Sequence, residues 1–387
     1  MSQKCFGLDY RSGAPTQVRF GTVIEGVDEL IHAPENSLPY VAPGFVDLQV
    51  NGFAGVDYCA PGASLEDIDR SLKAQFACGV TRLLPTVITG GRDTMCEALA
   101  MLAKAKRELP EGEAMEGFHA EGPFISGEDG PRGAHPVQHA RPYSLAEWHE
   151  MQKAAEGNIK VLTLSPEYPG VGAFVREVVS EGVVVSIGHT KATREQIQEA
   201  VDAGATMSTH IGNGAHAILP RHPNYIWEQL AEDRLTASFI VDGIHLPPSF
   251  LKVGLRAKGL ERSVLVTDAV MPAGCEPGPY RLGEVEVTLH PGDTGTARVT
   301  LLDGNRLAGS ALKMHVGVGN LMSLAGLSLV DAVTLATTNA ARAGRIGGRM
   351  RGLNPGERGD LVEFTLNEKK LTVERTWLSG RLVYERA

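Results

Sequence analysis

The sequence has 387 residues, enough for one large barrel or doubly wound domain or for two ordinary domains. Its 46 acidic and 37 basic residues give a formal net charge of −9. This balance argues against a nucleic acid or an anionic membrane as the partner, because both require a basic surface. Hydrophobic residues make up 43% and charged residues 21%, which indicates a folded globular protein rather than a disordered one.

The five cysteines are scattered and form no CxxC pair, which predicts free thiols rather than a disulfide framework. The first ten residues lack the apolar segment of a secretory signal. No apolar run approaches the roughly 18 residues that are needed to span a bilayer. Together these features predict a cytoplasmic protein.

Both ends of the chain have a β character. Residues 1–42 contain short alternating segments, for example 17–20 and 22–24, and residues 356–387 contain strand-like runs at 361–364, 371–376 and 382–384. Neither end is long enough to fold alone. We therefore expect residues 1–42 and 356–387 to pair into one small β-sandwich domain beside the rest of the chain.

Between these ends, short apolar runs alternate with stretches of helical periodicity. Near-continuous apolar strands separated by helices indicate a parallel sheet that is covered on both faces. Eight such strands predict an α/β protein with a (β/α)8 TIM barrel over residues 43–355, although periodicity alone leaves an open sheet as the alternative. The runs are 45–50, 81–88, 115–119, 161–165, 183–188, 206–210, 237–241 and 264–267, and the helical stretches include 64–78, 92–109, 145–156, 194–203 and 248–258.

One segment inside the barrel region departs from this alternation. Residues 280–302 are rich in strand formers, and turn signals stand at Pro291-Gly292 and Asp303-Gly304. This pattern predicts a β insertion after the eighth strand, over about residues 276–306.

Polar side chains follow the ends of most of the eight runs. In a (β/α)8 barrel the carboxyl ends of the strands converge on one mouth, and active sites form there. One or two ionisable groups at the same end of so many strands are hard to explain by packing. The sequence therefore predicts an active site built from Gln49, Asn51, His119, Glu121, Glu167, His189, His210, Asp242, His245 and Asp268.

Glu121, His189 and His210 are candidate metal ligands. Two imidazoles and one carboxylate suit Zn²⁺ or another borderline divalent ion such as Fe²⁺, with a coordination position left open for water. Taken singly, each histidine is better explained as an ordinary hydrogen-bonded residue. The three are far apart in the sequence, so the set has meaning only if a barrel brings the strand ends together, in which case we expect one divalent ion per chain.

Asp268 is the candidate general base. It directly follows the apolar run 264–267, so its carboxylate emerges from a strand into the predicted mouth. A carboxylate beside a metal site can take a proton from the attacking water. The alternative interpretation is a helix N-cap, a position at which Asp is favoured.

Several motifs resemble a known family. Pro-Gly-Phe-Val-Asp at 43–47, together with the split β domain, resembles the amidohydrolase superfamily. Within it, six motifs in order resemble the N-acetylglucosamine-6-phosphate deacetylases: Gln-Val-Asn-Gly at 49–52, His-Ala-Glu-Gly-Pro-Phe at 119–124, Gly-His-Thr at 188–190, Thr-His at 209–210, Asp-Gly-Ile-His at 242–245 and Val-Thr-Asp-Ala at 266–269. The resemblance continues through Ala-Gly-Ser at 308–310 and Thr-Asn-Ala-Ala at 338–341 and covers nearly the whole chain.

The resemblance implies a role for each candidate residue. One metal is held by Glu121, His189 and His210; Asp268 acts as base and then as acid; and His245 contacts the substrate and the developing oxyanion. Gln49 and Asn51 stand where most of the superfamily has a His-x-His pair for a second metal, and no bridging lysine is present on the fourth strand, which implies the single-metal branch. The implied substrate contacts are Gln49, Asn51, Asn213, Gly214 and His245, with Arg221 and His135 on the phosphate side and Leu307, Ala308 and Gly309 in the sugar pocket.

The segment 211–216 departs from the family pattern. The family has an aromatic residue followed by Asn-Ala-Met, whereas this chain reads Ile-Gly-Asn-Gly-Ala-His. The change affects the substrate side and leaves the metal side intact. Arg221, taken alone, could also be a solvated loop cation.

The function that the resemblance implies is removal of the acetyl group from N-acetylglucosamine 6-phosphate, giving glucosamine 6-phosphate and acetate in amino-sugar catabolism. One alternative function is deacetylation of another N-acetyl sugar phosphate or of an N-acyl amino acid. Another alternative is a non-catalytic barrel that serves as a scaffold. The family further implies a homodimer.

Overall fold

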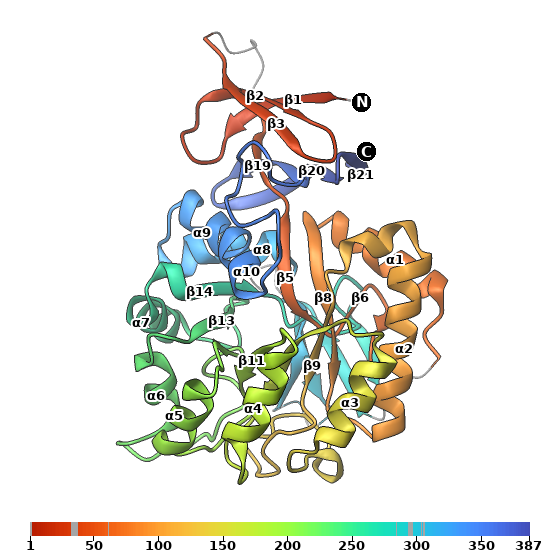
Figure 1. The fold of residues 1–387 in the computed structure, drawn as a ribbon. Helices are drawn as coiled ribbons and strands as arrows, with labels where there is room; N and C mark the ends of the chain where they lie inside the picture. Colours follow the sequence, from red (N-terminus) through yellow and green to blue (C-terminus); the bar gives the residue numbers. More distant parts are fainter. Residues whose placement is uncertain are drawn as a thin grey trace.

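Eight parallel strands run through the centre of the molecule and close into a barrel (Figure 1). The structure is a computed structural model that describes residues 2–387 except 32–37, 61, 284, 293–296, 303 and 305. A bridge between Val50 and Ala269 brings the first and last strands of the barrel together. The strands, in their order around the sheet, are β5 (Phe45–Val50), β8 (Val80–Ile88), β9 (Phe118–Glu121), β10 (Ile159–Leu164), β11 (Val184–Ile187), β12 (Met207–Ser208), β13 (Thr236–Ile240) and β14 (Ser263–Val266).

Helices cover the outside of the barrel (Figure 1). They are α1 (Leu65–Phe76), α2 (Arg92–Glu108), α3 (Leu145–Ala154), α4 (Val171–Ser180), α5 (Arg194–Asp202), α6 (Tyr225–Ala231), α7 (Pro248–Lys258), α8 (Met314–Asn320), α9 (Leu329–Leu335) and α10 (Thr338–Ala343). Short 3₁₀ helices span Pro110–Ala114, Val137–His139 and Leu260–Arg262, and a π-helical turn spans Leu321–Ala325.

Local sequence explains where these helices begin. The Ser64 side chain accepts a hydrogen bond from the backbone of Asp67, and the Asp67 side chain accepts one from the backbone of Ser64, so the two form a capping box at the start of α1. Ile68, Leu72 and Phe76 recur every four residues and bury one face of α1 against the barrel.

The predicted (β/α)8 fold is confirmed, and each of the eight apolar runs overlaps a barrel strand. The third run is displaced, because Met115 makes only an isolated bridge to Leu83 and the strand itself begins at Phe118. Helix α4 has no counterpart among the helical stretches named from the sequence.

The chain ends build one further sheet, which is the second part of the confirmed fold class. Its order is β21-β20-β19-β4-β1-β2-β3, and the pairing of β4 with β19 joins the N-terminal to the C-terminal strands. Phe20 on β2 lies edge-on against Trp377 on β20 with ring centroids 5.6 Å apart, so the two ends of this sheet face each other as a small sandwich. The predicted boundaries at residues 42 and 356 stay a prediction. The strands are β1 (Gln3–Asp9), β2 (Pro15–Phe20), β3 (Ile24–Glu29), β4 (Tyr40–Pro43), β19 (Leu361–Asn367), β20 (Lys370–Leu378) and β21 (Arg381–Glu385).

A four-stranded antiparallel sheet lies where the β insertion is predicted. It consists of β15 (Gly278–Leu282), β16 (Val285–His290), β17 (Arg298–Leu301) and β18 (Leu307–Ser310). A bridge between Ala269 and Ser310 fixes β18 to the residue that follows the catalytic candidate Asp268. The predicted turn at Asp303-Gly304 includes Asp303, which lies outside the described residues. Two short strands, β6 (Gly52–Phe53) and β7 (Val56–Asp57), form a hairpin after β5.

The interior of the barrel is arranged in layers. Near the small domain it is apolar, with Val161, Val184 and Met207 among the residues that form one cluster together with Ala340 and Ala341 of α10. Because side chains on a strand alternate, the residue two positions further along points into the same interior one layer up. Those residues are Thr163, Ser186 and Thr209, all buried, so a hydroxyl layer separates the apolar floor from the carboxyl ends of the strands.

A buried ion cluster joins the small domain to the barrel. Arg82 of β8 donates from Nε and Nη2 to the two carboxylate oxygens of Asp360, at 2.8 and 3.0 Å. Arg349 lies 2.8 Å from the same carboxylate, and all three side chains are at most 2% exposed. Burial alone would raise the pKa of Asp360, but the two guanidinium groups outweigh it and hold this pKa below its usual range.

Replacing Asp360 with Asn is expected to lower the free energy of unfolding by about 3–5 kcal/mol, because two buried guanidinium groups lose their counter-ion. Urea unfolding of the variant against the parent protein measures this. The matched control is Glu374→Gln, which breaks the more exposed pair with Arg386 at 3.4 Å and should cost less than about 1 kcal/mol. Equal effects of the two variants would contradict the role given to the cluster.

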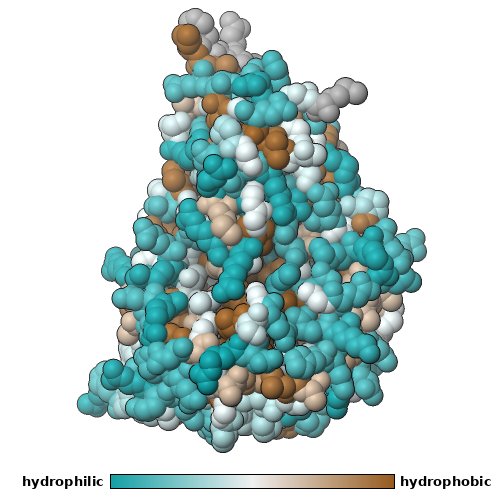
Figure 2. All heavy atoms as spheres, viewed as in Figure 1, coloured by the Kyte–Doolittle hydropathy of each residue, from teal (hydrophilic) through white to brown (hydrophobic). Residues whose placement is uncertain are grey.

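None of the described helices is long and apolar enough to cross a membrane. The face seen in Figure 2 is mostly hydrophilic, with apolar side chains scattered over it. The five cysteines are free, as the sequence predicts.

Candidate active site

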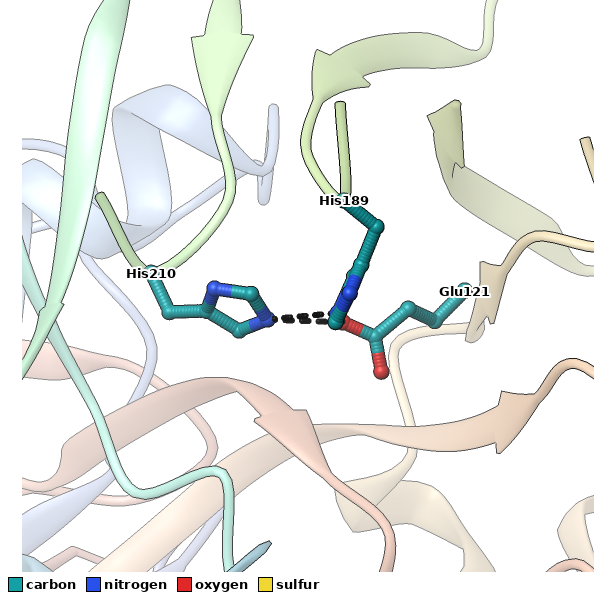
Figure 3. A group of neighbouring side chains, drawn as sticks. All are labelled: Glu121, His189 and His210. Carbon is teal, nitrogen blue, oxygen red and sulfur yellow. Dashed lines mark hydrogen bonds and ion pairs between the residues drawn. The ribbon is translucent and has the colours of Figure 1, made fainter. Parts of the chain in front are cut away.

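Glu121, His189 and His210 come together at the carboxyl ends of the barrel strands (Figure 3). Glu121 is the last residue of β9, and the two histidines follow β11 and β12. Glu121 Oε1 lies 3.2 Å from His189 Nε2 and 3.0 Å from His210 Nε2, and the two Nε2 atoms are 3.1 Å apart. All three side chains are buried. The fold therefore brings these three residues together, as the sequence analysis expects.

The donor set fits a divalent metal ion. His189 Nδ1 lies 2.9 Å from the carbonyl oxygen of Pro131, which can only accept, so Nδ1 carries the proton and Nε2 presents its lone pair to the other two residues. Three donors held about 2.1 Å from a tetrahedral ion lie about 3.4 Å apart, close to the separations observed here. Two imidazoles and a carboxylate are a donor set that zinc and similar ions bind.

The backbone is strained at this site. The φ angles are +48° at His189, +28° at His210 and +49° at Asp268. Residues with a Cβ adopt this region at a cost of order 1–3 kcal/mol, and such residues cluster at functional sites. Here the left-handed turn at the end of each strand directs a side chain into the barrel mouth.

Asp268 lies in the same mouth and is buried. Burial, and then the negative charge of Glu121, raise the pKa of Asp268 to about 6. Asn51 Nδ2 donates to Asp268 Oδ1 at 2.7 Å, which fixes the orientation of the carboxylate. The structure thus places Asp268 as a strand-end carboxylate beside the three candidate ligands, and the N-cap interpretation fails because no helix begins at this residue.

The end of the first strand supplies amide groups. Gln49 Nε2 donates to Glu121 Oε1 at 2.8 Å, and Gln49 is only 2% exposed. Gln49 therefore orients the candidate metal ligand Glu121 through this hydrogen bond. Asn51 lines the cavity described below, and Gln49 does not. The Nδ2 and Nε2 groups of Asn51 and Gln49 donate to Asp268 and to Glu121.

Two further histidines face the site. The His245 Nδ1 atom lies 2.6 Å from Asp242 Oδ2, and since the carboxylate accepts, Nδ1 donates. Burial would raise the pKa of Asp242, but the hydrogen bond and charge of His245 outweigh it and lower this pKa. His135 Nε2 lies 3.1 Å from His189 Nε2, so the structure places His135 beside the candidate metal ligands.

A cavity of about 730 Å³ opens above these residues. Asn213, Gly214, His245 and residues 307–309 of β18 line it together with Asp268 and the three candidate ligands, as the resemblance implies. Arg221 is exposed, and it is not among the residues that line the cavity of its own chain. Its contact with a phosphate stays a prediction.

Much of the cavity wall carries no predicted role. The wall continues over Cys59 and Ile88 to Met95 on α2, and it is completed by Val285, Val287 and Leu301 of the insertion sheet. For the residues of the insertion, the only signal in the sequence is its alternating pattern, which shows that one face is buried but not which part of the protein covers it.

The hydroxyl layer forms a directed chain beneath the candidate ligands. Burial lowers the pKa of His119 to about 4, so its imidazole is neutral. His119 Nδ1 donates to the carbonyl oxygen of Leu48 at 3.1 Å, and Nε2 therefore accepts from Thr163 Oγ1 at 2.7 Å. Thr163 in turn accepts from Thr209, and Thr209 from Ser186, at 2.7 and 2.6 Å. This chain links β9, β10, β11 and the residues after β12, the elements that carry or flank the three ligands.

With this geometry the chain can be compared with known proteins. Residues 40–383 match the amidohydrolase family, and these residues include the whole barrel and every candidate site residue. The chain belongs to the amidohydrolase family. The family implies a divalent metal, and the buried group of Glu121, His189 and His210 is the candidate for its ligands.

Several curated relatives of this chain are deacetylases of amino-sugar phosphates. An N-acetylglucosamine-6-phosphate deacetylase from Bacillus subtilis is 32% identical, over 86% of this chain and 82% of that protein. An N-acetylgalactosamine-6-phosphate deacetylase from Escherichia coli O157:H7 is 30% identical, over 93% and 92% of the two chains. Among solved structures, a mutant N-acetyl-D-glucosamine-6-phosphate deacetylase from Mycobacterium smegmatis in complex with N-acetyl-D-glucosamine-6-phosphate has a TM-score of 0.84, with 29% identity over 95% and 94% of the chains.

Proposed function

We propose that this amidohydrolase removes the acetyl group from N-acetylglucosamine 6-phosphate, giving glucosamine 6-phosphate and acetate. The observation that carries the proposal is the meeting of Glu121, His189, His210 and Asp268 in one buried mouth under a cavity of about 730 Å³. The relatives named above act on substrates of this class and support the choice. A barrel that serves only as a scaffold has no need for this arrangement.

Glu121, His189 and His210 would hold one divalent ion, and we propose Zn²⁺, with Fe²⁺ as the next candidate. When bound, such an ion polarises the amide carbonyl and lowers the pKa of water toward about 7. The amides of Gln49 and Asn51 stand at the end of the first strand and donate to Glu121 and Asp268. This arrangement supports a single ion per chain.

Asp268 is the proposed proton carrier. It takes a proton from the attacking water while the water oxygen bonds to the amide carbon. Asp268 then delivers this proton to the nitrogen, the C–N bond breaks, and the free amine leaves together with acetic acid, which loses its remaining proton to solvent and becomes acetate. A base whose pKa is raised toward 6 is suited to both steps, since it must accept a proton and release it again near neutral pH.

His245 is the proposed donor to the oxyanion. Because Asp242 accepts the Nδ1 proton, the second nitrogen of the ring is left for the substrate, to which it can donate in the doubly protonated ring. A donor that meets the charge developing on the carbonyl oxygen contributes on the order of 3 kcal/mol to the rate.

The galactosamine epimer is the second candidate substrate. The E. coli relative that acts on it is about as similar to this chain as the glucosamine enzymes are. Acetate release should be measured with N-acetylglucosamine 6-phosphate, with its galactosamine epimer, with unphosphorylated N-acetylglucosamine and with an N-acetyl amino acid. We expect the first substrate to have the highest kcat/KM; a higher value for the epimer or for the N-acetyl amino acid would replace the proposed substrate.

We also propose that the enzyme is a cytoplasmic homodimer. Ile218 is 89% exposed and Trp227 is 48% exposed on the segment and helix next to Arg221, and a second copy packed there would cover both. In that arrangement Arg221 would serve the phosphate side of a site at the interface. Arg221→Ala should raise KM for the phosphorylated substrate at least tenfold with little change for the unphosphorylated sugar. Equal effects on both substrates, or a monomer by light scattering, would refute this arrangement.

A further inference from the structure

The carboxyl group of Asp47 has no part in the chemistry proposed above. Asp47 lies on β5 and is fully buried, with an exposed fraction of 0%. Burial raises its pKa to about 7, because the hydrogen bonds that it accepts do not offset the loss of solvation. An ionisable group that is removed from water at this cost is a candidate for a functional role.

Asp47 binds the residue that follows the last strand of the barrel. Its Oδ1 atom accepts from the backbone N–H of Thr267 at 3.2 Å and from that of Gln49 at 3.3 Å. The Thr267 hydroxyl donates to Asp47 Oδ2 at 2.5 Å. Because a backbone N–H can only donate, Oδ1 is an acceptor whether or not the carboxyl group is ionised. Asp47 on β5 thus fixes Thr267, which comes directly after β14, by both its backbone and its side chain.

Thr267 in turn holds the chain on both sides of the proposed base. It directly precedes Asp268, and its hydroxyl oxygen accepts from the backbone N–H of Ala269, the residue after the base, at 3.2 Å. The φ of +49° at Asp268 is a conformation that costs free energy and persists only where neighbouring contacts impose it. Between β5 and β14 the described residues form a single bridge, at Val50 and Ala269. Strand pairing at this seam is therefore sparse, and the contact between Asp47 and Thr267 adds to it.

We propose that Asp47 is a positioning residue that, through the Thr267 hydroxyl, holds Asp268 in the orientation from which its carboxylate takes the proton of the attacking water. The inference rests on the proposed function and adds a residue to it. Asp47 acts at a distance from the substrate, because it does not line the cavity. Displacing a reacting group by about 1 Å can cost about 10²-fold in rate, so the loss of this contact should appear in kcat.

Thr267→Val is the sharpest test, because valine keeps the size and the branched Cβ of threonine and removes only the hydroxyl. We expect kcat for acetate release to fall about 10- to 100-fold, with KM within about twofold of the parent value. The metal content should stay unchanged, since the three candidate ligands are untouched. Thr267→Ser restores the hydroxyl and should bring kcat back to within about threefold of the parent value. Asp47→Ala removes the acceptor itself and should lower kcat at least as much as Thr267→Val.

Thr376→Val is the matched control for a general loss of stability. Thr376 on β20 is also buried, and its hydroxyl donates to the carbonyl oxygen of Phe76 at 2.8 Å. This variant should lower the midpoint of urea unfolding about as much as Thr267→Val and keep its kcat. An unchanged kcat in Thr267→Val, an equal loss of kcat in Thr376→Val, or a fall in metal content that accounts for the lost activity would overturn the positioning role and leave the proposed function standing. A parent protein that releases no acetate would overturn both.

Discussion

Asp268→Asn is expected to reduce kcat for acetate release by at least about 10³-fold. An amide cannot accept the proton of the attacking water, and the group that performs general acid–base catalysis typically contributes 10²–10⁴-fold. The amide has the same shape as the carboxylate, and Asn51 remains next to it. Folding, metal content and substrate binding should therefore change little.

Steady-state kinetics together with calorimetric binding of the substrate separates these effects. Asp129→Asn is the matched control, because the Asp129 side chain is 87% exposed and lies outside the cavity wall. A variant at Asp268 that keeps near-normal kcat would refute its assignment as the proton carrier. A loss of binding as large as the loss of kcat would reassign it to the substrate site.

Glu121→Gln is expected to remove the metal and, with it, the activity. The carboxylate is the negatively charged member of the buried set and contacts both histidines, at 3.2 and 3.0 Å. A neutral amide is a much poorer ligand for a divalent ion. We expect the metal content after dialysis to fall from about one ion per chain to near zero, and kcat/KM to fall at least 10³-fold.

The chain offers an internal control for this prediction. His149, Glu177 and Glu181 form a second group with metal-ligand spacing among the described residues, but this group is exposed, on α3, on α4 and at the residue that follows α4. Glu181→Gln should leave both the metal content and the activity unchanged. If Glu181→Gln lost the ion instead, the buried group would not be the metal site.

The barrel could be predicted because its strands are near-continuous apolar runs of the right length. The run at 45–50 coincides with β5, and the predicted helix at 248–258 coincides with α7. The displaced β9 shows the limit of this argument, since Met115 is apolar and buried without belonging to a strand. Apolar character reports burial, whereas pairing with both neighbouring strands decides where a strand begins.

The candidate site could be predicted in part, for a related reason. Strand ends converge in any closed barrel, so Glu121, His189, His210 and Asp268 could be brought together from the sequence pattern. The position of Gln49 could not, because its hydrogen bond to Glu121 depends on the relative stagger of the first and third strands, which β8 separates in the sheet. The wall formed by Val287 and Leu301 depends likewise on how the insertion sheet folds over the mouth.

The structure gives a reason for the difference between residues 211–216 and the family pattern. Gly214 has a φ of +55°, and a Cβ at this position would meet His189 Nδ1 at 2.6 Å, so the loop can approach the imidazole only as glycine. At the end of the segment, His216 Nε2 lies 2.8 Å from Glu128 Oε1, and His216 Nδ1 lies 3.0 Å from the hydroxyl oxygen of Tyr225. The segment is therefore tied to the loop that carries His135.

Metal-dependent removal of the acetyl group at the buried triad is tested most directly by titrating the chelated protein with Zn²⁺ while acetate release from N-acetylglucosamine 6-phosphate is followed. The account predicts no turnover after chelation, and recovery that rises linearly and saturates at one ion per chain. Undiminished turnover of the chelated protein, or no acetate at any loading, would contradict it.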